Sequence, residues 1–273
     1  MEGFKAVLFT TRMNVFNQTF APVGGAINGS VYGFIWDDAT CGRKSEDIMS
    51  YYIRYLRMEK EKKHVVLWLD NCSSQNKNWT LFLVMILLVN SALVQTNVVE
   101  FKFFEPGHTF MSADSFHHSV ERRMKAAERG HVLTTDDFFE CVNTAQQNAV
   151  AVRMDPADFC FCELECKQPT KKRPRPLLNT VKYVQFVRGS YDFIYGEDFS
   201  GQIATCNLFT RDQLRTIKSP NFDFAEKLHY RSTPCGIEST ESTRLQAIKE
   251  KNVPLLPPEK KMFWYTLPER TSN

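Results

Sequence analysis

The sequence lacks an N-terminal segment that combines basic residues, an apolar core and a small-residue cleavage site, so we expect no secretory signal. The eight cysteines are therefore expected to be reduced thiols, and the protein to be intracellular, in the nucleus or the cytoplasm. A formal charge of only +3 over 273 residues does not indicate nucleic-acid binding by itself. Any basic surface must be local.

A continuous apolar run long enough to cross a membrane is also missing. Residues 79–99 carry no charge and are rich in Leu, Val and Met, but polar residues from Asn90 onward interrupt the run. About fourteen strongly apolar residues remain, fewer than the roughly 20 that a bilayer requires. We predict a buried core helix here and no membrane partner.

The usual zinc-binding pattern of paired C-x2-C motifs is absent. Cys160, Cys162 and Cys166 give C-x-C-x3-C instead, and no histidine pair follows them. Zinc is therefore not expected, and these residues are interpreted as reduced thiols on a strand and a turn.

The hydrophobic pattern predicts alternating strands and helices over the first 150 residues. A strand at 31–36, an amphipathic helix at 45–58 and a buried strand ending at Leu69 resemble a βαβ crossover, which would make the two strands parallel. The apolar helix, a strand at 98–104 and two further helices, at 112–130 and within 131–150, follow. The fold class predicted is α/β.

Three regions are predicted along the chain. Residues 1–150 form the α/β domain, residues 151–215 a small β-rich extension with a basic, proline-interrupted linker, and residues 216–273 an arm with one short helix near 242–251. No internal repeat is apparent.

Carboxylates occur where a metal site would need them. Asp70 follows a buried strand, Asp37 ends another, and Asp114 and Glu121 share a helix face with His117 beside them. Mg²⁺ prefers oxygen ligands, and two such ions about 3.5 to 4 Å apart can stabilise both oxygens of a phosphoryl transfer. The alternative is structural, since Asp114 can cap its helix and Glu121 can pair with a lysine four residues on.

Polar and basic residues suggest contacts with phosphate. Those after Asp70 (Asn71, Gln75, Asn76, Lys77 and Asn78) lie where a helix would begin, a place suited to anions, although capping and turn formation explain amides equally well. His108 lies in a turn and can bind a metal or a phosphate, or be structural. A basic run in the linker can contact nucleic acid, act as a nuclear-import signal or simply be solvated. It comprises Lys171, Lys172, Arg173 and Arg175.

Three spaced motifs resemble an uncharacterised family of transposase-derived domains with an RNase H-like fold. The motifs are D-N-C-x-x-Q-N-K-N, G-H-[ST] and D-S-x-H-x-x-[IV]-E. They fall on Asp70, Asn71, Cys72, Gln75, Asn76, Lys77 and Asn78, then Gly107, His108 and Thr109, then Asp114, Ser115, His117, Val120 and Glu121.

The resemblance implies a mixed sheet flanked by helices and an ancestral Mg²⁺-dependent cleavage or strand transfer of DNA. It assigns Asp70, Asp114 and Glu121 to the metal, with His117 assisting. RNase H-like enzymes hold their first catalytic aspartate on the opening strand of a meander, and this sequence offers only about eight residues before the segment that resembles its second strand. We therefore expect a catalytically incomplete member of the family unless Asp37 substitutes.

Two other interpretations remain open. The chain can be a non-enzymatic remnant that binds nucleic acid or protein through the basic linker and through the basic residues of the 112–130 helix. It can also be a fragment that does not fold stably because its edge strand is missing.

Overall fold

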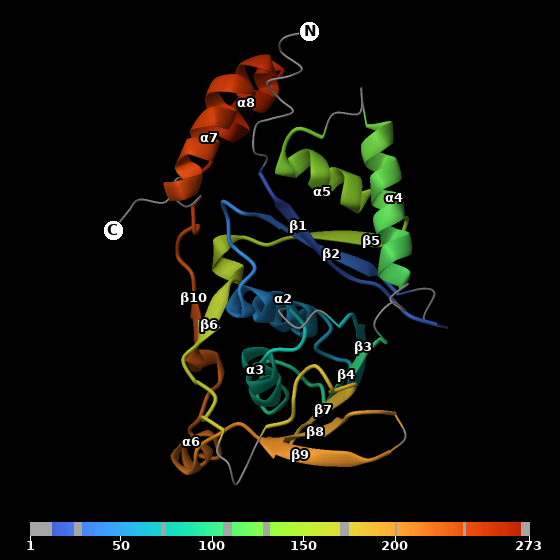
Figure 1. Ribbon diagram of the computed structural model, residues 1–273, viewed down its shortest axis with the longest axis vertical. Coiled ribbons are helices and arrows are strands. Elements are labelled where there is room, and N and C mark those ends of the chain that lie inside the picture. Colours follow the sequence, from blue (N-terminus) through green and yellow to red (C-terminus); the bar gives the residue numbers. More distant parts are fainter. Residues whose placement is uncertain are drawn as a thin grey trace. The chain divides into compact units, whose positions relative to one another are not determined.

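The computed structural model describes residues 13–24, 29–71, 75–105, 111–127, 132–169, 175–199, 201–236 and 239–268 (Figure 1). Residue contacts divide the chain into two compact units that are each discontinuous in sequence. Unit 1 comprises Met1–Gly42, Phe110–Ala157 and Arg231–Asn273, and unit 2 comprises Arg43–Thr109 and Asp158–Tyr230. The three regions predicted from the sequence, by contrast, are continuous.

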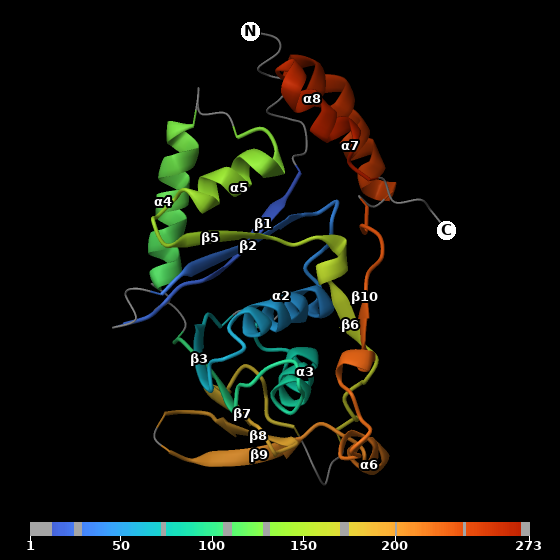
Figure 2. The same cartoon turned by 180° about the vertical axis from the view of Figure 1, so that it is seen from behind.

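Unit 1 is built on a three-stranded mixed sheet. Its strands lie in the order β1 (Val15–Phe20), β2 (Val31–Asp37) and β5 (Ala149–Arg153), with β1 antiparallel and β5 parallel to the central β2. Helices α4 (Ser112–Ala126) and α5 (Thr135–Asn143) lie on the same side of this sheet in both views (Figures 1 and 2). The core between them consists of Val31, Ile35, Phe116, Val120, Cys141 and Val142.

The predicted apolar stripe of α4 explains this packing. Phe116 and Val120 are buried in the core and Met124 packs against it. Gly33 in the middle of β2 allows α5 to approach, because a Cβ atom at this position would lie 2.7 Å from Cγ1 of Val142. A larger residue would push α5 off the sheet.

The C-terminal part of unit 1 is helical. It contains α7 (Ser239–Lys251), the 3₁₀ turn η4 (Val253–Leu255) and α8 (Pro258–Tyr265). The predicted short helix corresponds to α7, whereas α8 was not predicted. Its first residue is a proline, which ends a helix in the interior but is well tolerated at the first helical position.

Unit 2 contains a five-stranded sheet in the order β3-β4-β7-β8-β9. Strands β3 (His64–Leu69) and β4 (Val98–Phe103) are parallel, and β7 (Tyr183–Val187), β8 (Asp192–Gly196) and β9 (Ile203–Asn207) continue the sheet as antiparallel neighbours. β7, β8 and β9, which the sequence analysis placed in a separate β-rich extension, therefore belong to this sheet.

Helices α2 (Ser45–Met58) and α3 (Trp79–Val89) supply the core of unit 2. Every residue of α3 from Leu81 to Val89 is buried, as predicted for a core helix. Phe82 of α3 packs against Phe101, Phe186 and Phe193 of the sheet. No helix in the described ranges is long and apolar enough to cross a membrane.

Shorter elements complete unit 2. Strand β6 (Cys160–Cys162) pairs with β10 (Leu228–Tyr230), and α6 (Arg211–Ile217) follows β9.

The predicted βαβ crossover over residues 31–70 is wrong. β2 and β3 lie in different sheets, and β3 pairs with β4 in parallel, with α3 as the connection. The apolar pattern correctly identified the two strands and the helix. The apolar pattern does not determine which strands pair, because a buried strand shows the same pattern whichever strand lies next to it.

Candidate functional site

The clearest polar site in unit 2 lies where β3 ends. Val65, Leu67 and Leu69 are buried along β3, and Asp70 is the first residue beyond it. β4 runs parallel to β3 and continues to Phe104, whose N–H donates to the carbonyl of Leu69 at 3.0 Å. Asp70 follows a buried strand, as predicted, and it lies at the carboxyl edge of the two parallel strands β3 and β4. This is the edge at which open α/β sheets hold ligands.

Asn76 orients the carboxylate of Asp70. Its Nδ2 donates to Oδ1 of Asp70 at 2.5 Å, and its own Oδ1 accepts the hydroxyl proton of Tyr52 at 2.8 Å. Tyr52 comes from α2 and is completely buried, and Asn76 is only 6% exposed. Because the hydroxyl is a donor here, the amide of Asn76 is fixed with its NH₂ toward Asp70.

The protonation state of Tyr52 supports this arrangement. Burial raises the pKa of its hydroxyl well above the usual value of 10, and the charges of Tyr51 and Asp70 raise it further. Tyr52 therefore stays protonated over the physiological range and remains a hydrogen-bond donor to Asn76.

Asn71, the next residue in the sequence, carries an oxygen without a hydrogen-bond donor in the described ranges. Its Nδ2 donates to the carbonyl of Phe104, which leaves Oδ1 as the acceptor end of the amide. This Oδ1 is buried and has no hydrogen-bond partner within the described ranges. A buried acceptor without a donor costs about 1 to 3 kcal/mol, so it marks a place where a ligand atom would be stabilised.

The other amides of the block are structural. Oδ1 of Asn78 accepts the N–H of Leu81 at 2.7 Å and caps α3, and its Nδ2 donates to the carbonyl of Gln75 at 2.7 Å. The capping alternative considered for these amides therefore applies to Asn78, whereas Asn76 holds the carboxylate of Asp70.

Lys77 is a buried cation in the same turn. It is only 2% exposed, and its Nζ lies 4.6 Å from the centre of the Phe103 ring. Burial, with a smaller contribution from the charge of Lys182, lowers its pKa to about 8, and Glu105 opposes the shift. No ion pair of Lys77 occurs among the residues that the structure describes.

The other predicted metal ligands belong to unit 1. Asp114 is exposed and caps α4, since its Oδ2 accepts the N–H of Met111 at 2.7 Å. Nε2 of His117 lies 2.9 Å from the hydroxyl of Thr19 on β1. Burial lowers the pKa of His117, while Asp114 and Glu121 oppose this change. Asp114, His117 and Glu121 therefore all lie on α4, whereas Asp70 belongs to unit 2.

Asp37 has a structural role in unit 1. It is 6% exposed, and its Oδ1 accepts both the N–H and the hydroxyl of Thr40, at 2.9 and 2.8 Å. Its Oδ2 accepts the hydroxyl of Thr135, the first residue of α5, at 2.9 Å. Three donors therefore tie this carboxylate to the end of β2 and the start of α5.

Cys162 and Cys166 of unit 2 are protonated thiols in buried surroundings. Burial raises the pKa of Cys162, and it raises that of Cys166 to about 11. Sγ of Cys166 donates to the carbonyl of Trp79 at 3.5 Å. Within the described ranges, no three His, Cys, Asp or Glu side chains are grouped so that they could hold a metal ion.

The basic linker is described only in part. His108, Lys171, Lys172 and Arg173 lie outside the described residues. Arg175 donates to the carbonyl of Lys167, and its guanidinium lies 4.9 Å from the centre of the Trp79 ring. It therefore packs within unit 2.

A known family model matches the central part of the chain. Residues 25–161 match the model of a domain of unknown function, DUF7869. The chain belongs to the DUF7869 family. The DUF7869 match contains Asp70 and the whole amide block, as well as Asp114, His117 and Glu121. No curated protein and no solved structure shows significant similarity to the chain.

One residue of the DUF7869 region was not anticipated as part of the site. The sequence analysis predicted an amphipathic helix over residues 45–58, and Tyr52 is buried on the core-facing side of that helix. Its hydroxyl, however, needs a partner in that core, and a buried tyrosine usually finds one. The need for a hydrogen-bond partner could have indicated from the sequence that Tyr52 belongs to a polar site. It could not have identified Asn76 as that partner.

Proposed function

We propose that the chain is a transposon-derived protein of the RNase H-like class whose ancestral reaction was the Mg²⁺-dependent cleavage and strand transfer of DNA. The motifs around Asp70 and along α4 support this class by resemblance. The observation that carries the proposal is the orientation of the Asp70 carboxylate, at the carboxyl end of a parallel strand, by Asn76 and Tyr52. Its DNA substrate implies an intracellular location, in the nucleus or the cytoplasm.

The donor set beside Asp70 fits a hard divalent cation. A carboxylate and the orphaned Oδ1 of Asn71 are both oxygen ligands of the kind that Mg²⁺ and Mn²⁺ prefer. A bound ion there would supply electrophilic stabilisation of a phosphate oxygen. The chain contributes the fixed carboxylate, because Asn76 holds it in one orientation without solvent rearrangement.

The ancestral site is proposed to be catalytically incomplete in this chain. A two-metal reaction requires several carboxylates that are available to metal. Asp37 instead accepts three hydrogen bonds from Thr40 and Thr135, and Asp114 accepts one from the backbone of Met111. We therefore expect cation binding at Asp70 with little or no DNA cleavage.

Mn²⁺ binding to the full chain tests the site directly. Electron paramagnetic resonance of free Mn²⁺ measures the dissociation constant, which should rise at least tenfold in Asp70→Asn and in Asn71→Leu. Asp212→Asn is the matched control, because this exposed carboxylate lies on α6. Absence of Mn²⁺ binding to the wild type, or equal affinity in Asp70→Asn, would refute the cation site.

Plasmid nicking in Mg²⁺ tests the incompleteness separately. The wild type is expected to leave supercoiled DNA intact under conditions where Mn²⁺ is bound. Cleavage that disappears in Asp70→Asn would support the class and overturn the incompleteness. Cleavage that survives this substitution would contradict both.

The second candidate function is nucleic-acid binding without catalysis, and the exposed basic end of α4 favours it. Arg122, Arg123 and Lys125 are exposed. Arg123 is partly engaged, since its Nε donates to the carbonyl of Thr144 at 2.7 Å. Cations in the last turn also stabilise a helix electrostatically, so their exposure alone does not prove a DNA contact.

Salt-dependent DNA binding distinguishes this candidate. Fluorescence anisotropy of a labelled duplex should show binding that survives Asp70→Asn. If Arg122 and Lys125 contact phosphates, their joint replacement by glutamine should reduce the slope of log K against log salt by about 2, since each phosphate contact contributes about 0.9. An unchanged slope would exclude this helix as the DNA contact.

A further inference from the structure

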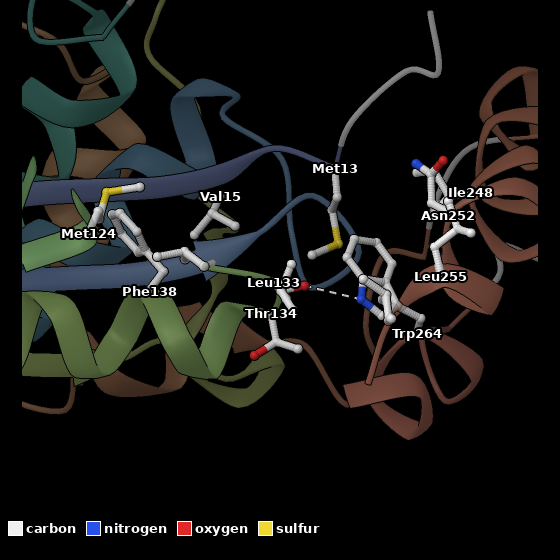
Figure 3. Close-up of a pocket in the computed structure, with 12 residues that line it drawn as sticks. Met13, Val15, Met124, Leu133, Thr134, Phe138, Ile248, Asn252, Leu255 and Trp264 are labelled. Carbon is white, nitrogen blue, oxygen red and sulfur yellow. Dashed lines mark hydrogen bonds between the residues drawn. The ribbon is translucent and has the colours of Figure 1, made fainter. Parts of the chain in front are cut away.

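Unit 1 contains an apolar cavity of about 510 Å³ (Figure 3). On its wall, Nε1 of Trp264 donates to the carbonyl of Leu133 at 3.1 Å, the dashed line in Figure 3. Most of the side chains that line the cavity are apolar. Its walls therefore do not specify an occupant, whereas a buried charge without a counter-ion specifies the charge of its ligand.

Unit 2 contains such a charge at Lys77. The side chain is only 2% exposed, and a buried charge is costly unless it is paired. Lys77 has no carboxylate partner among the described residues, and the undescribed segments 72–74 and 106–110, which follow β3 and β4, contain no Asp or Glu. The Phe103 ring, whose centre lies 4.6 Å from Nζ, is neutral. The positive charge is therefore left without compensation, a feature that often marks a binding site.

Nζ of Lys77 is open to solvent although the rest of the side chain is covered. It donates no hydrogen bond to a described residue, and it is not one of the unpaired side-chain atoms that are closed to solvent. The side chains of Lys182 and Glu105, which are 17% and 57% exposed, lie at the end of β4 that Phe103 occupies. A ligand atom can therefore reach the ammonium group from the surface.

Two further charged groups surround Lys77. The N–H of Phe103 donates to the carbonyl of Lys182 at 2.9 Å, which places Lys182 beside the residue that Nζ of Lys77 contacts. Nζ of Lys182 donates to Oε2 of Glu105 at 2.7 Å. Both charges act on Lys77, since Lys182 lowers its pKa and Glu105 raises it. Two ammonium groups and one carboxylate leave one uncompensated positive charge, which matches the single negative charge of a phosphodiester.

Lys77 belongs to the segment that orients the Asp70 carboxylate. Asn76, the residue before Lys77, donates to Oδ1 of Asp70 at 2.5 Å. The segment between β3 and α3 thus carries a ligand for a cation and a ligand for an anion. Phosphoryl-transfer sites combine the two, because the metal ion and a lysine bind different oxygens of the phosphates.

We propose that Lys77, supported by Lys182, binds a singly charged phosphate group, which is a phosphodiester of the DNA substrate in the proposed function on which this inference rests. A lysine binds phosphate as a point charge. Binding therefore requires the protonated amine, so the affinity should depend on the protonation of Lys77.

DNA affinity at different pH values tests the proposal. Fluorescence anisotropy of a labelled duplex, with EDTA present to remove divalent ions, gives the dissociation constant of the full chain at pH 7 and pH 9. The pKa of about 8 leaves about nine tenths of Lys77 protonated at pH 7 and about one tenth at pH 9. The wild type should therefore lose affinity about fivefold over this range, the equivalent of one weak charged contact.

Substitutions of Lys77 separate its contribution from that of other groups. Lys77→Met should bind at pH 7 as weakly as the wild type does at pH 9, and it should fold because it removes an uncompensated buried charge. Lys77→Arg stays charged over the whole range and should bind equally well at both pH values. The exposed Lys218 supplies the control Lys218→Met, which should keep the pH dependence of the wild type. If Lys77→Arg does not fold, the comparison with Lys77→Met decides alone.

Inorganic phosphate distinguishes a free ion from DNA as the source of the phosphate group. If it stabilises the wild type against urea but not Lys77→Met, while DNA affinity does not depend on Lys77, the site takes free phosphate and the DNA assignment is overturned. An equal loss of DNA affinity in the wild type and Lys77→Met, with no effect of phosphate, would overturn the whole proposal, as would failure of the wild type to bind either probe. Asp70→Asn should keep the pH dependence in EDTA, so failure of the cation site is recognised separately by Mn²⁺ binding.

Discussion

The hydroxyl of Thr19 on β1 lies 2.9 Å from Nε2 of His117 on α4. This contact joins the helix that carries Asp114 and Glu121 to the sheet of unit 1. The imidazole is half-buried, and burial lowers its pKa below the ordinary value of 6.5. Its titration therefore links the stability of unit 1 to pH.

Acid should destabilise the protein through His117 at pH values below 6.5. The unfolded chain binds a proton at His117 as the pH falls through 6.5, whereas the folded chain resists protonation until its lower pKa is reached. The stability that the neutral imidazole contributes above 6.5 is thus lost as the pH falls. We expect the free energy of unfolding, measured by urea denaturation, to fall less between pH 7.5 and pH 5 in the double variant Thr19→Val/His117→Phe than in the wild type.

The control for this prediction lies next to His117 in sequence. His118 is exposed, so His118→Gln should leave the acid loss unchanged. An equal loss in the wild type and the double variant would show that other groups cause it.

Lys77 should reduce stability at neutral pH. Its pKa is about 8 in the fold and 10.5 in the unfolded chain, so the unfolded state binds more protons between these values and stability rises with pH across this window. Lys77→Met should therefore stabilise the protein at pH 7 by on the order of 1 to 3 kcal/mol, given about 1.4 kcal/mol per pKa unit. The difference from wild type, measured by urea denaturation, should shrink as the pH approaches 10.

An exposed lysine provides the comparison. Lys125→Met should change stability little and show no such narrowing with pH. If Lys77→Met is destabilising at pH 7, the ammonium group has an anionic partner that stabilises it in the fold.

Cys41 and Cys235 should form a disulfide on oxidation. Their sulfur atoms lie 3.6 Å apart, and the N–H groups of Cys235 and Gly236 donate to the carbonyls of Thr40 and Ala39 at 3.0 and 2.9 Å. Hydrogen-bonded backbones at this separation suit disulfide geometry. With oxidised glutathione, one thiolate forms a mixed disulfide and the other displaces glutathione thiol.

Mass spectrometry checks this outcome. The non-reduced protein should lose two hydrogens, and peptide mapping should recover the Cys41–Cys235 cross-link. Cys235→Ser should prevent it, whereas Cys141→Ser should not, because Cys141 lies on α5. A glutathione adduct that persists at Cys235 without the cross-link would show that the thiols do not meet in solution.

Helices and strands were predictable from the sequence where a single hydrophobic pattern extends over the whole element. Helix α2 runs over residues 45–58 as predicted, because Ile48, Tyr52 and Leu56 form a single buried stripe. β5 was missed because its alternating Ala and Val residues continue the apolar pattern of the preceding predicted helix, so the sequence shows no boundary between the two. β9 was missed because its first three residues are exposed, so it has little apolar signal.

The candidate site was predictable in its residues but not in its connections. Asp70 and its amides were identified from their place after a buried strand. The contact between Tyr52 and Asn76 joins positions 24 residues apart on different elements, and only packing of α2 against the sheet and α3 creates it. The roles of Asp37 and Asp114 likewise depend on which donors surround each carboxylate.

The order in which the chain is synthesised has a consequence for its folding, because the chain passes between the two units four times. β2 pairs with β5 through Val31 and Ala149, so an early strand must wait for more than a hundred residues before its parallel partner leaves the ribosome. α7 and α8, which belong to unit 1, follow every residue of unit 2 in the sequence. Unit 2 can therefore be completed during translation before unit 1, which can reach its final packing only after α7 and α8 have been made.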